Sequence, residues 1–539
     1  MAVAEIAGLA PEPEGRHAPA GSMLVLDRVS KRFGRVQALS EISLNIVSGA
    51  VHCLLGENGA GKSTLCNLVF GVYQPDAGTM LFDGKPHAPQ GPADALRAGI
   101  AMVHQHFSLV PDMTVTENVL LGRTRGLLDR KAWAARIQAL SDEYSLAVDP
   151  STLVGDLSVG ERQRIEIIKC MIDSPRLIIL DEPTAVLLPE EIAKLMSVCR
   201  SLAERGCAIV LVTHKLAEIK QVADTVTVLR QGRTVATSAE PAKDIQRLVS
   251  AMVQRDLASL DVALAGTLGV SEDAVGADNG IREPHLPRGQ EAMQLDALTV
   301  KDANGVLRVD DVTLTVDRGE IVGVAGVEGN GQTEIGLVLA GLLKPTSGRV
   351  FIGGTEATSK SPREITAMGV GIVPEDRHAI ACISSMSLAE NMYLNRLDGF
   401  RRFGLLRRGQ MEREAATLMT QFDVRADGPR TPFSSLSGGN QQKAVLAREL
   451  TTERLLFLLA AQPTRGLDVG AVEAVYKSIR KTCEAGVGVL LISSELDELI
   501  AVAHRIVVLY RGRIIGERRA HPKFRHDIGM LMAGQQPWA

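Results

Sequence analysis

One stretch decides the fold of this chain: Gly56-Glu57-Asn58-Gly59-Ala60-Gly61-Lys62-Ser63-Thr64. The apolar run before it, residues 51–55, predicts a buried strand, and the apolar spacing after it, residues 65–70, predicts a helix. A glycine-rich loop that joins a strand to a helix and ends in Gly-Lys-Ser is typical of a phosphate-binding loop. The glycines let the loop N–H groups point inward, Lys62 reaches the β- and γ-phosphates, and Ser63 offers its hydroxyl to Mg²⁺.

The bulk composition bounds the rest. A chain of 539 residues is too long for one core, so we expect at least two domains. A net charge of −4 gives no support for a nucleic-acid binder. The seven cysteines are scattered and form no C-x-x-C pair, which indicates reduced thiols, and no run approaches the roughly 18 apolar residues of a membrane span. Residues 1–22 lack the basic start and apolar core of a secretory signal, so we expect a disordered extension.

The first predicted domain, residues 23–255, carries further polar signals. Residues 177–180 are an apolar strand that ends in Asp181 and Glu182, and two carboxylates there suit a hydrated Mg²⁺ and a general base. A strand over residues 100–105 ends in Gln105, and a strand over residues 208–213 is followed by His214.

Two weaker signals accompany them. Leu157-Ser158-Val159-Gly160-Glu161 opens an apolar helix and forms a second anion site, although Ser-x-Gly is often only a helix cap. Phe33 is placed either to stack on an adenine ring or simply to fill a strand edge.

Taken in order, these motifs resemble the ATP-binding cassette of ABC transporters. The resemblance spans nearly all of the first domain and implies an α/β fold, a RecA-like P-loop core with an antiparallel β subdomain and an inserted helical subdomain. It also implies ATP and Mg²⁺ as cofactors, with Gln105 sensing the metal and the permease. In that family His214 would read the γ-phosphate and Glu182 would activate the attacking water.

The pattern then repeats. After a linker at residues 256–291, a second predicted cassette covers residues 292–535. Gly326 to Thr333 aligns with the first loop at an offset of 270 (326 − 56), and Leu436-Ser437-Gly438-Gly439 aligns with Leu157 onward at 279 (436 − 157). The chain is therefore an internal duplication.

The two halves are not equivalent. The second half has substitutions at every position suited to chemistry: Gln332 for Lys62, Glu375 for Gln105, Ala461 for Asp181, Gln462 for Glu182 and Ser494 for His214. Its signature, however, is the complete Leu-Ser-Gly-Gly, and Asp468 follows its last motif. The first half has Val159 inside its signature and Leu188 in place of that aspartate.

Cassettes of the family pair head to tail, so each ATP lies between one P-loop and the other half's signature. With that geometry one site has all of the motif residues, and every substitution falls in the other site. If each half instead bound ATP with its own signature, neither site would be complete. The complete site combines residues of both halves: Phe33, Gly56 to Thr64, Gln105, Asp181, Glu182 and His214 with Ser437, Gly438, Gly439 and Asp468. The resemblance implies that Ser63, Gln105 and Asp181 would be the metal ligands within it, and that Lys62, Gln105, Glu182 and His214 would be catalytic.

The resemblance implies an import ATPase. Tandem cassettes with a degenerate second half resemble the ATPases of bacterial monosaccharide and nucleoside importers. The amino-acid sequences of the motifs resemble the nucleoside branch more. Its partners would be two permease subunits and an extracytoplasmic solute-binding protein, with no nucleic acid. The chain would sit peripherally on the cytoplasmic face of the inner membrane. The alternatives are a monosaccharide importer or a soluble tandem-cassette ATPase acting on ribosomes, which usually has two intact sites and a charged linker.

Overall fold

A computed structural model describes residues 21–535, except residues 35, 58, 105–107, 124–128, 158, 185–186, 188, 214, 254–288, 303, 328, 404, 466 and 468. The expected extension and linker therefore lie almost wholly outside the described residues. The first strand starts at Ser22, one residue before the predicted start of the first cassette at residue 23.

The elements of the first half follow an α/β order. They are β1 (Ser22–Phe33), β2 (Val36–Val47), β3 (Val51–Leu55), α1 (Lys62–Val69), β4 (Ala77–Phe82), β5 (Lys85–Pro86), α2 (Pro92–Ala98), β6 (Ile100–Val103), α3 (Val115–Leu120), α4 (Arg130–Glu143), α5 (Val159–Met171), β7 (Leu177–Asp181), α6 (Pro189–Glu204), β8 (Ala208–Thr213), α7 (Leu216–Val222), β9 (Thr225–Arg230), β10 (Arg233–Ser238) and α8 (Pro241–Val253).

The second half repeats this order with one added hairpin. Its elements are β11 (Glu291–Lys301), β12 (Leu307–Asp317), β13 (Ile321–Ala325), α10 (Gln332–Leu339), β14 (Ser347–Ile352), β15 (Thr355–Glu356), α11 (Pro362–Ala367), β16 (Val370–Val373), α12 (Leu388–Met392), β17 (Arg401–Arg402), β18 (Leu405–Leu406), α13 (Arg408–Gln421), α14 (Gly438–Leu450), β19 (Phe457–Ala461), α15 (Val469–Glu484), β20 (Gly488–Ile492), α16 (Leu496–Val502), β21 (Arg505–Tyr510), β22 (Arg513–Arg519) and α17 (Arg525–Met532).

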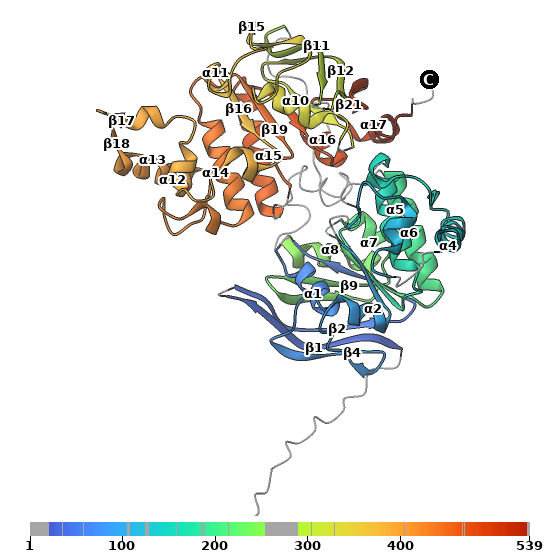
Figure 1. Ribbon diagram of the computed structural model, residues 1–539. Helices are drawn as coiled ribbons and strands as arrows, with labels where there is room; N and C mark the ends of the chain where they lie inside the picture. The colour runs from blue at the N-terminus through green and yellow to red at the C-terminus, as the bar shows by residue number, and fades with distance from the viewer. Residues whose placement is uncertain are drawn as a thin grey trace, which may run out of the picture.

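Each half contains a four-stranded and a six-stranded sheet with the same strand order in both halves, and the second half adds the two-stranded sheet β17-β18 (Figure 1). In the described part of the first half, a four-stranded antiparallel sheet has the order β2-β1-β4-β5, and a six-stranded sheet has the order β10-β9-β3-β8-β7-β6. The second half repeats both as β12-β11-β14-β15 and β22-β21-β13-β20-β19-β16. The predicted fold, two tandem α/β cassettes with separate antiparallel and helical parts, is confirmed.

Strand length is where sequence and structure differ most. Apolar runs at residues 24–26 and 42–46 predict short strands, yet β1 and β2 each extend over twelve residues. They pair along their whole length, and buried residues in β2 alternate with exposed ones. The polar side chains of the outer face interrupt the apolar run, while the pairing continues through several shifts of register.

The central strand explains why the loop is held where it is. All five residues of β3 are buried, and β3 lies between β8 and β9 in parallel register. Because the carboxyl ends of parallel strands meet at one edge of a sheet, the loop after β3 lies beside the ends of β7 and β8. The antiparallel sheet packs its apolar face on α1 and on one face of the central sheet.

Within the described residues, no helix has the length and apolar content needed to cross a membrane. The two halves contact each other where α7 and α16 begin, through an ion pair between Lys215 and Glu495.

Candidate nucleotide site

The glycine-rich loop of the first half is shaped by its backbone. Gly61 has a φ of 102°, a left-handed conformation that favours glycine, and it precedes the first turn of α1. A Cβ atom on Gly56 would lie 2.4 Å from the carbonyl oxygen of Leu229. These two glycines therefore allow the loop to turn tightly and to pass close to β9.

Lys62 lies inside this loop. Its side chain is buried, and Nζ donates hydrogen bonds to the carbonyl oxygens of Gly56 at 2.7 Å and of Glu57 at 3.0 Å. Burial lowers the pKa of Lys62, while the carboxylates of Glu182 and Asp181 oppose that shift. The ammonium group is thus held by weak neutral acceptors in the centre of the loop, where a phosphate would be a stronger partner.

Asp181 has the properties of a metal ligand. It is 4% exposed at the end of β7, and its Oδ1 atom has no hydrogen-bond partner. Burial raises its pKa, and a hydrogen bond with the side chain of Ser63 opposes this shift. An ionised carboxylate with an unsatisfied buried oxygen is costly unless a cation binds there. The Ser63 and Asp181 pair therefore fits a hard divalent cation such as Mg²⁺.

Glu182 follows directly and has an unusual backbone. Its φ is 48°, a left-handed conformation that is strained for a residue with a side chain. Its N–H donates to the carbonyl oxygen of Val212, and its Oε1 lies 3.7 Å from Lys62 Nζ. The backbone thus turns the Glu182 carboxylate toward the loop, as a general base acting beside the phosphates requires.

Phe33 ends β1 as an exposed aromatic rather than as core filling. Its side chain is 40% exposed, and its ring meets Tyr73 edge to face, with 5.0 Å between the ring centroids. The exposed ring suits stacking against a planar base. The sequence analysis missed Tyr73, which lies 40 residues away and is brought there by the loop after α1.

The second half keeps the shape and lacks the charge. Gln332 takes the place of Lys62, and its Nε2 donates to the carbonyl oxygen of Val327, which is equivalent to Glu57. Its Oε1 is buried without a partner. Gln462 has a φ of 46°, matching Glu182, but it carries an amide and follows Ala461. No carboxylate stands at these two positions to hold a metal or act as a base.

The predicted sensor position has also changed. Glu375, which aligns with Gln105, is bound by Arg465 Nη1 at 2.6 Å. This ion pair neutralises the glutamate and ties it to the loop that follows β19.

The complete signature begins α14. Ser437 is the N-cap, its Oγ accepts a hydrogen bond from the N–H of Asn440, and its side chain is exposed. A groove of about 480 Å³ opens there, lined by Ser437, Gly439, Asn440 and Lys443 together with residues of α15. The N–H groups at the helix N-terminus make this groove suited to an anion, while the Lys443 ammonium is paired with Asp423 at 2.8 Å.

The other signature faces the opposite half. A cleft of about 1110 Å³ is lined by Leu157, Gly160 and Glu161 of the first half and by Val327, Gly329 and Asn330 of the second. The first signature and the second glycine loop thus share one cavity. By contrast, α1 and α14 lie far apart in Figure 1.

Comparison with known proteins agrees with this architecture. The family model described as ABC transporter matches residues 39–185 and 309–460. The chain belongs to the ABC transporter family.

Similar members of this family cover nearly the whole chain. The nucleoside import ATP-binding protein NupA of Lactococcus lactis is 41% identical over 94% of this chain and 97% of its own length. The guanosine import protein NupO of Bacillus subtilis is 40% identical over 94% and 96%. The ribose import protein RbsA of Corynebacterium glutamicum is 39% identical over 96% and 94%. As an ABC ATP-binding protein, the chain is an ATPase coupled to transport.

Several ABC motif residues expected from the sequence lie outside the described residues. They are Asn58, Gln105, Ser158, Leu188, His214 and Asp468. At the glycine loop, Lys62 lies beside Glu182, and Ser63 lies beside Asp181, whereas Phe33 contacts Tyr73. Ser437, Gly438 and Gly439 lie at α14, away from that loop.

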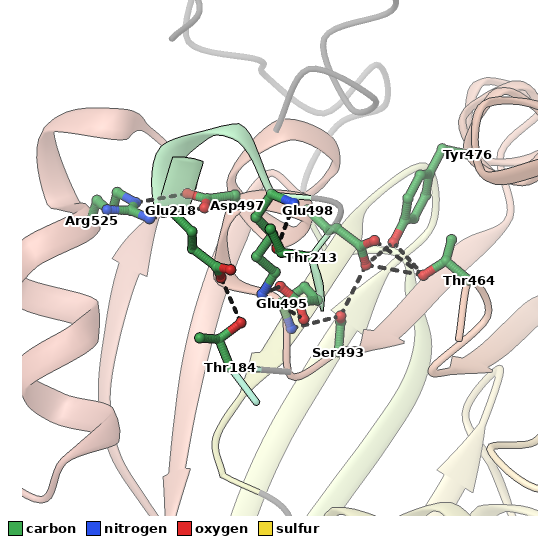
Figure 2. A network of polar contacts seen from close by, with 11 residues as sticks. Thr184, Thr213, Glu218, Thr464, Tyr476, Ser493, Glu495, Asp497, Glu498 and Arg525 are labelled. Carbon is green, nitrogen blue, oxygen red and sulfur yellow. Dashed lines mark hydrogen bonds and ion pairs between the residues drawn. The ribbon is translucent and has the colours of Figure 1, made fainter. Parts of the chain in front are cut away.

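A polar network that the sequence did not predict joins residues of both halves near the contact between them (Figure 2). Thr184 donates to Glu218 in the first half, while Thr464, Tyr476 and Ser493 all donate to Glu498 in the second. The offset of 280 that equates Glu218 with Glu498 could have revealed this network, because the glutamates and threonines recur at that spacing.

Proposed function

We propose that this chain is the ATP-hydrolysing subunit of an importer for nucleosides, and that it hydrolyses ATP at one of two composite sites. The observation that carries the proposal is the contrast between Lys62, Asp181 and Glu182 in one half and Gln332, Ala461 and Gln462 in the other. Loss of a single preorganised group typically costs about 10²–10³ in rate, so a site that lacks all three does not turn over usefully.

Each residue of the competent site has a distinct task. Lys62 exchanges its carbonyl partners for the β- and γ-phosphates of ATP, which are stronger acceptors for its ammonium group. Mg²⁺ held by Ser63 and Asp181 would neutralise charge on the same phosphates. Glu182 takes a proton from the attacking water, and Phe33 stacks on the adenine. Gln105 and His214 would complete the site as metal and γ-phosphate sensors.

The cassettes pair head to tail in this proposal. Support comes from the cleft that contains the first signature and the second glycine loop, because this is one of the two crosswise clefts that such a pairing creates. The second crosswise cleft would form when α14 approaches α1. Ser437, Gly438, Gly439 and Asp468 would then close on the ATP held by Lys62.

The transported solute is inferred from relatives. Two relatives named for nucleoside and guanosine import are 41% and 40% identical, and a relative named for ribose import follows at 39%. We therefore favour a nucleoside over a monosaccharide. The partners would be two permeases and an extracytoplasmic binding protein, with this chain peripheral on the cytoplasmic face of the membrane.

One experiment tests the site and the solute together. Cells that carry Glu182→Gln should lose uptake of radiolabelled guanosine, and the purified variant should lose ATPase activity by at least about 10²-fold. The matched variant Gln462→Ala should retain both activities. Comparable losses in the two variants would contradict a single competent site, and uptake of ribose instead of guanosine would favour the monosaccharide alternative.

A further inference from the structure

The contact between the two halves joins positions that the duplication makes equivalent. Lys215 precedes α7 and Glu495 precedes α16, 280 residues later (495 − 215). Both loops have the same local structure, because the N–H of Lys215 donates to Thr213 Oγ1 at 2.9 Å and the N–H of Glu495 donates to Ser493 Oγ at 3.1 Å.

These two equivalent residues bind each other. Lys215 Nζ donates to both carboxylate oxygens of Glu495, at 3.1 and 2.8 Å, and the side chains are only 16% and 29% exposed. Glu495 lies in the middle of the network in Figure 2. In an assembly with two-fold symmetry, a residue meets its own equivalent only on the axis. The Lys215–Glu495 pair therefore marks the pseudo-two-fold axis that relates the cassettes.

Opposite charges on this axis have a consequence for partner choice. If two first cassettes from different chains paired in the same way, Lys215 would face Lys215, and two second cassettes would bring Glu495 against Glu495. Like charges placed together at a partly buried contact repel each other and disfavour association. We infer that the Lys215–Glu495 pair makes the two unlike cassettes of one chain pair with each other and prevents pairing between like cassettes.

The surroundings of the pair support this role. Burial alone would lower the pKa of Lys215, but the carboxylates of Glu495 and Glu218 raise it, so the lysine is charged at the axis. Glu498 is the counterpart of Glu218 and contributes a carboxylate from the other half. Each end of the pair thus stands beside one buried glutamate of similar placement.

The inference rests on the proposed function for its biological meaning. Pairing of like cassettes would never unite Lys62 and Glu182 with the complete signature at Ser437, since the first cassette carries Val159 in its own signature. The charge pair would therefore protect the single arrangement that contains a complete site. Opposite charge at the axis thus disfavours the arrangements in which no complete site can form.

A charge reversal in the full-length chain tests the inference. The variants Lys215→Glu and Glu495→Lys should each enlarge the radius of gyration seen by X-ray scattering, because either change places like charges at the contact between the two cassettes. Each should also lower ATPase activity at least about 10-fold. The double variant K215E/E495K should restore the wild-type radius and most of the activity, because the swap exchanges two equivalent environments.

Reversal at Arg513 provides the control. Arg513 pairs with Asp310 at 2.6 Å inside the second cassette, so Arg513→Glu should leave radius and activity near wild type. Single reversals at the axis that behave like this control, or a double variant no better than the singles, would overturn the inference. If the wild-type chain failed to hydrolyse ATP, the proposed function would fall, while the radius would still decide the role of the pair.

Discussion

At the scale of single residues, the two glycine loops separate shape from charge. Gln332 reproduces the hydrogen bond that Lys62 Nζ makes to the loop, but an amide brings no positive charge to a phosphate. Ala461 likewise keeps the strand end and removes the carboxylate. The second loop has therefore retained what its backbone needs and lost what hydrolysis needs.

The buried Glu498 gives a pH-dependent prediction. Burial and the neighbouring Glu495 raise the pKa of Glu498 from 4.5 to about 6. Because the folded state then holds the proton more tightly than the unfolded state, the free energy of unfolding should fall as pH rises from about 4.5 to about 6. The fall should be roughly 2 kcal/mol. Glu498→Gln should remove this slope in denaturation experiments across that range, and an unchanged slope would show that Glu498 is not its source.

At the scale of elements, the two signature helices begin differently. Ser437 caps α14 and is followed by two glycines, whereas α5 begins at Val159 in the corresponding motif. Small residues after the cap let a phosphate approach the helix N-terminus closely, and a β-branched side chain hinders that approach. The N-terminus of α14, with Ser437 and the two glycines after it, is thus open to close approach by a phosphate.

This difference predicts unequal effects of removing the two serines. Ser437→Ala should lower the ATPase rate by about 10²-fold, because Ser437 belongs to the competent site. Ser158→Ala should change the rate less than about 2-fold. Steady-state ATPase measurements on both purified variants decide between them, and the reverse order would refute the crosswise assignment.

At the scale of the whole molecule, the proposed mechanism needs α14 to move toward α1. Spin labels at Val72→Cys and Gln421→Cys would report this movement, and all seven native cysteines are buried and form no disulfide. Addition of ATP and Mg²⁺ to the Glu182→Gln background should shorten the distance between the labels. Addition of Lys62→Ala to the labelled Glu182→Gln chain should abolish the shortening. If both proteins shortened the distance equally, closure would not depend on ATP binding at Lys62.

The sequence predicted features formed by consecutive residues but did not predict contacts between residues that are far apart along the chain. The loop around Lys62 and the strand ending in Asp181 and Glu182 were predictable, because each is encoded by consecutive residues. The Lys215–Glu495 pair was not predicted, since 280 residues separate its members and only packing of the two halves joins them. The contact between Tyr73 and Phe33 was not predicted for the same reason.

The left-handed backbone at Gln462 has a consequence for engineering the second cassette. Gln462 has the same left-handed backbone (φ 46°) that Glu182 has (φ 48°), so the second cassette has the turn that orients a general base while its side chain is an amide. Engineering ATP hydrolysis into the second cassette would thus begin with side-chain substitutions on the existing backbone: lysine at Gln332, aspartate at Ala461 and glutamate at Gln462.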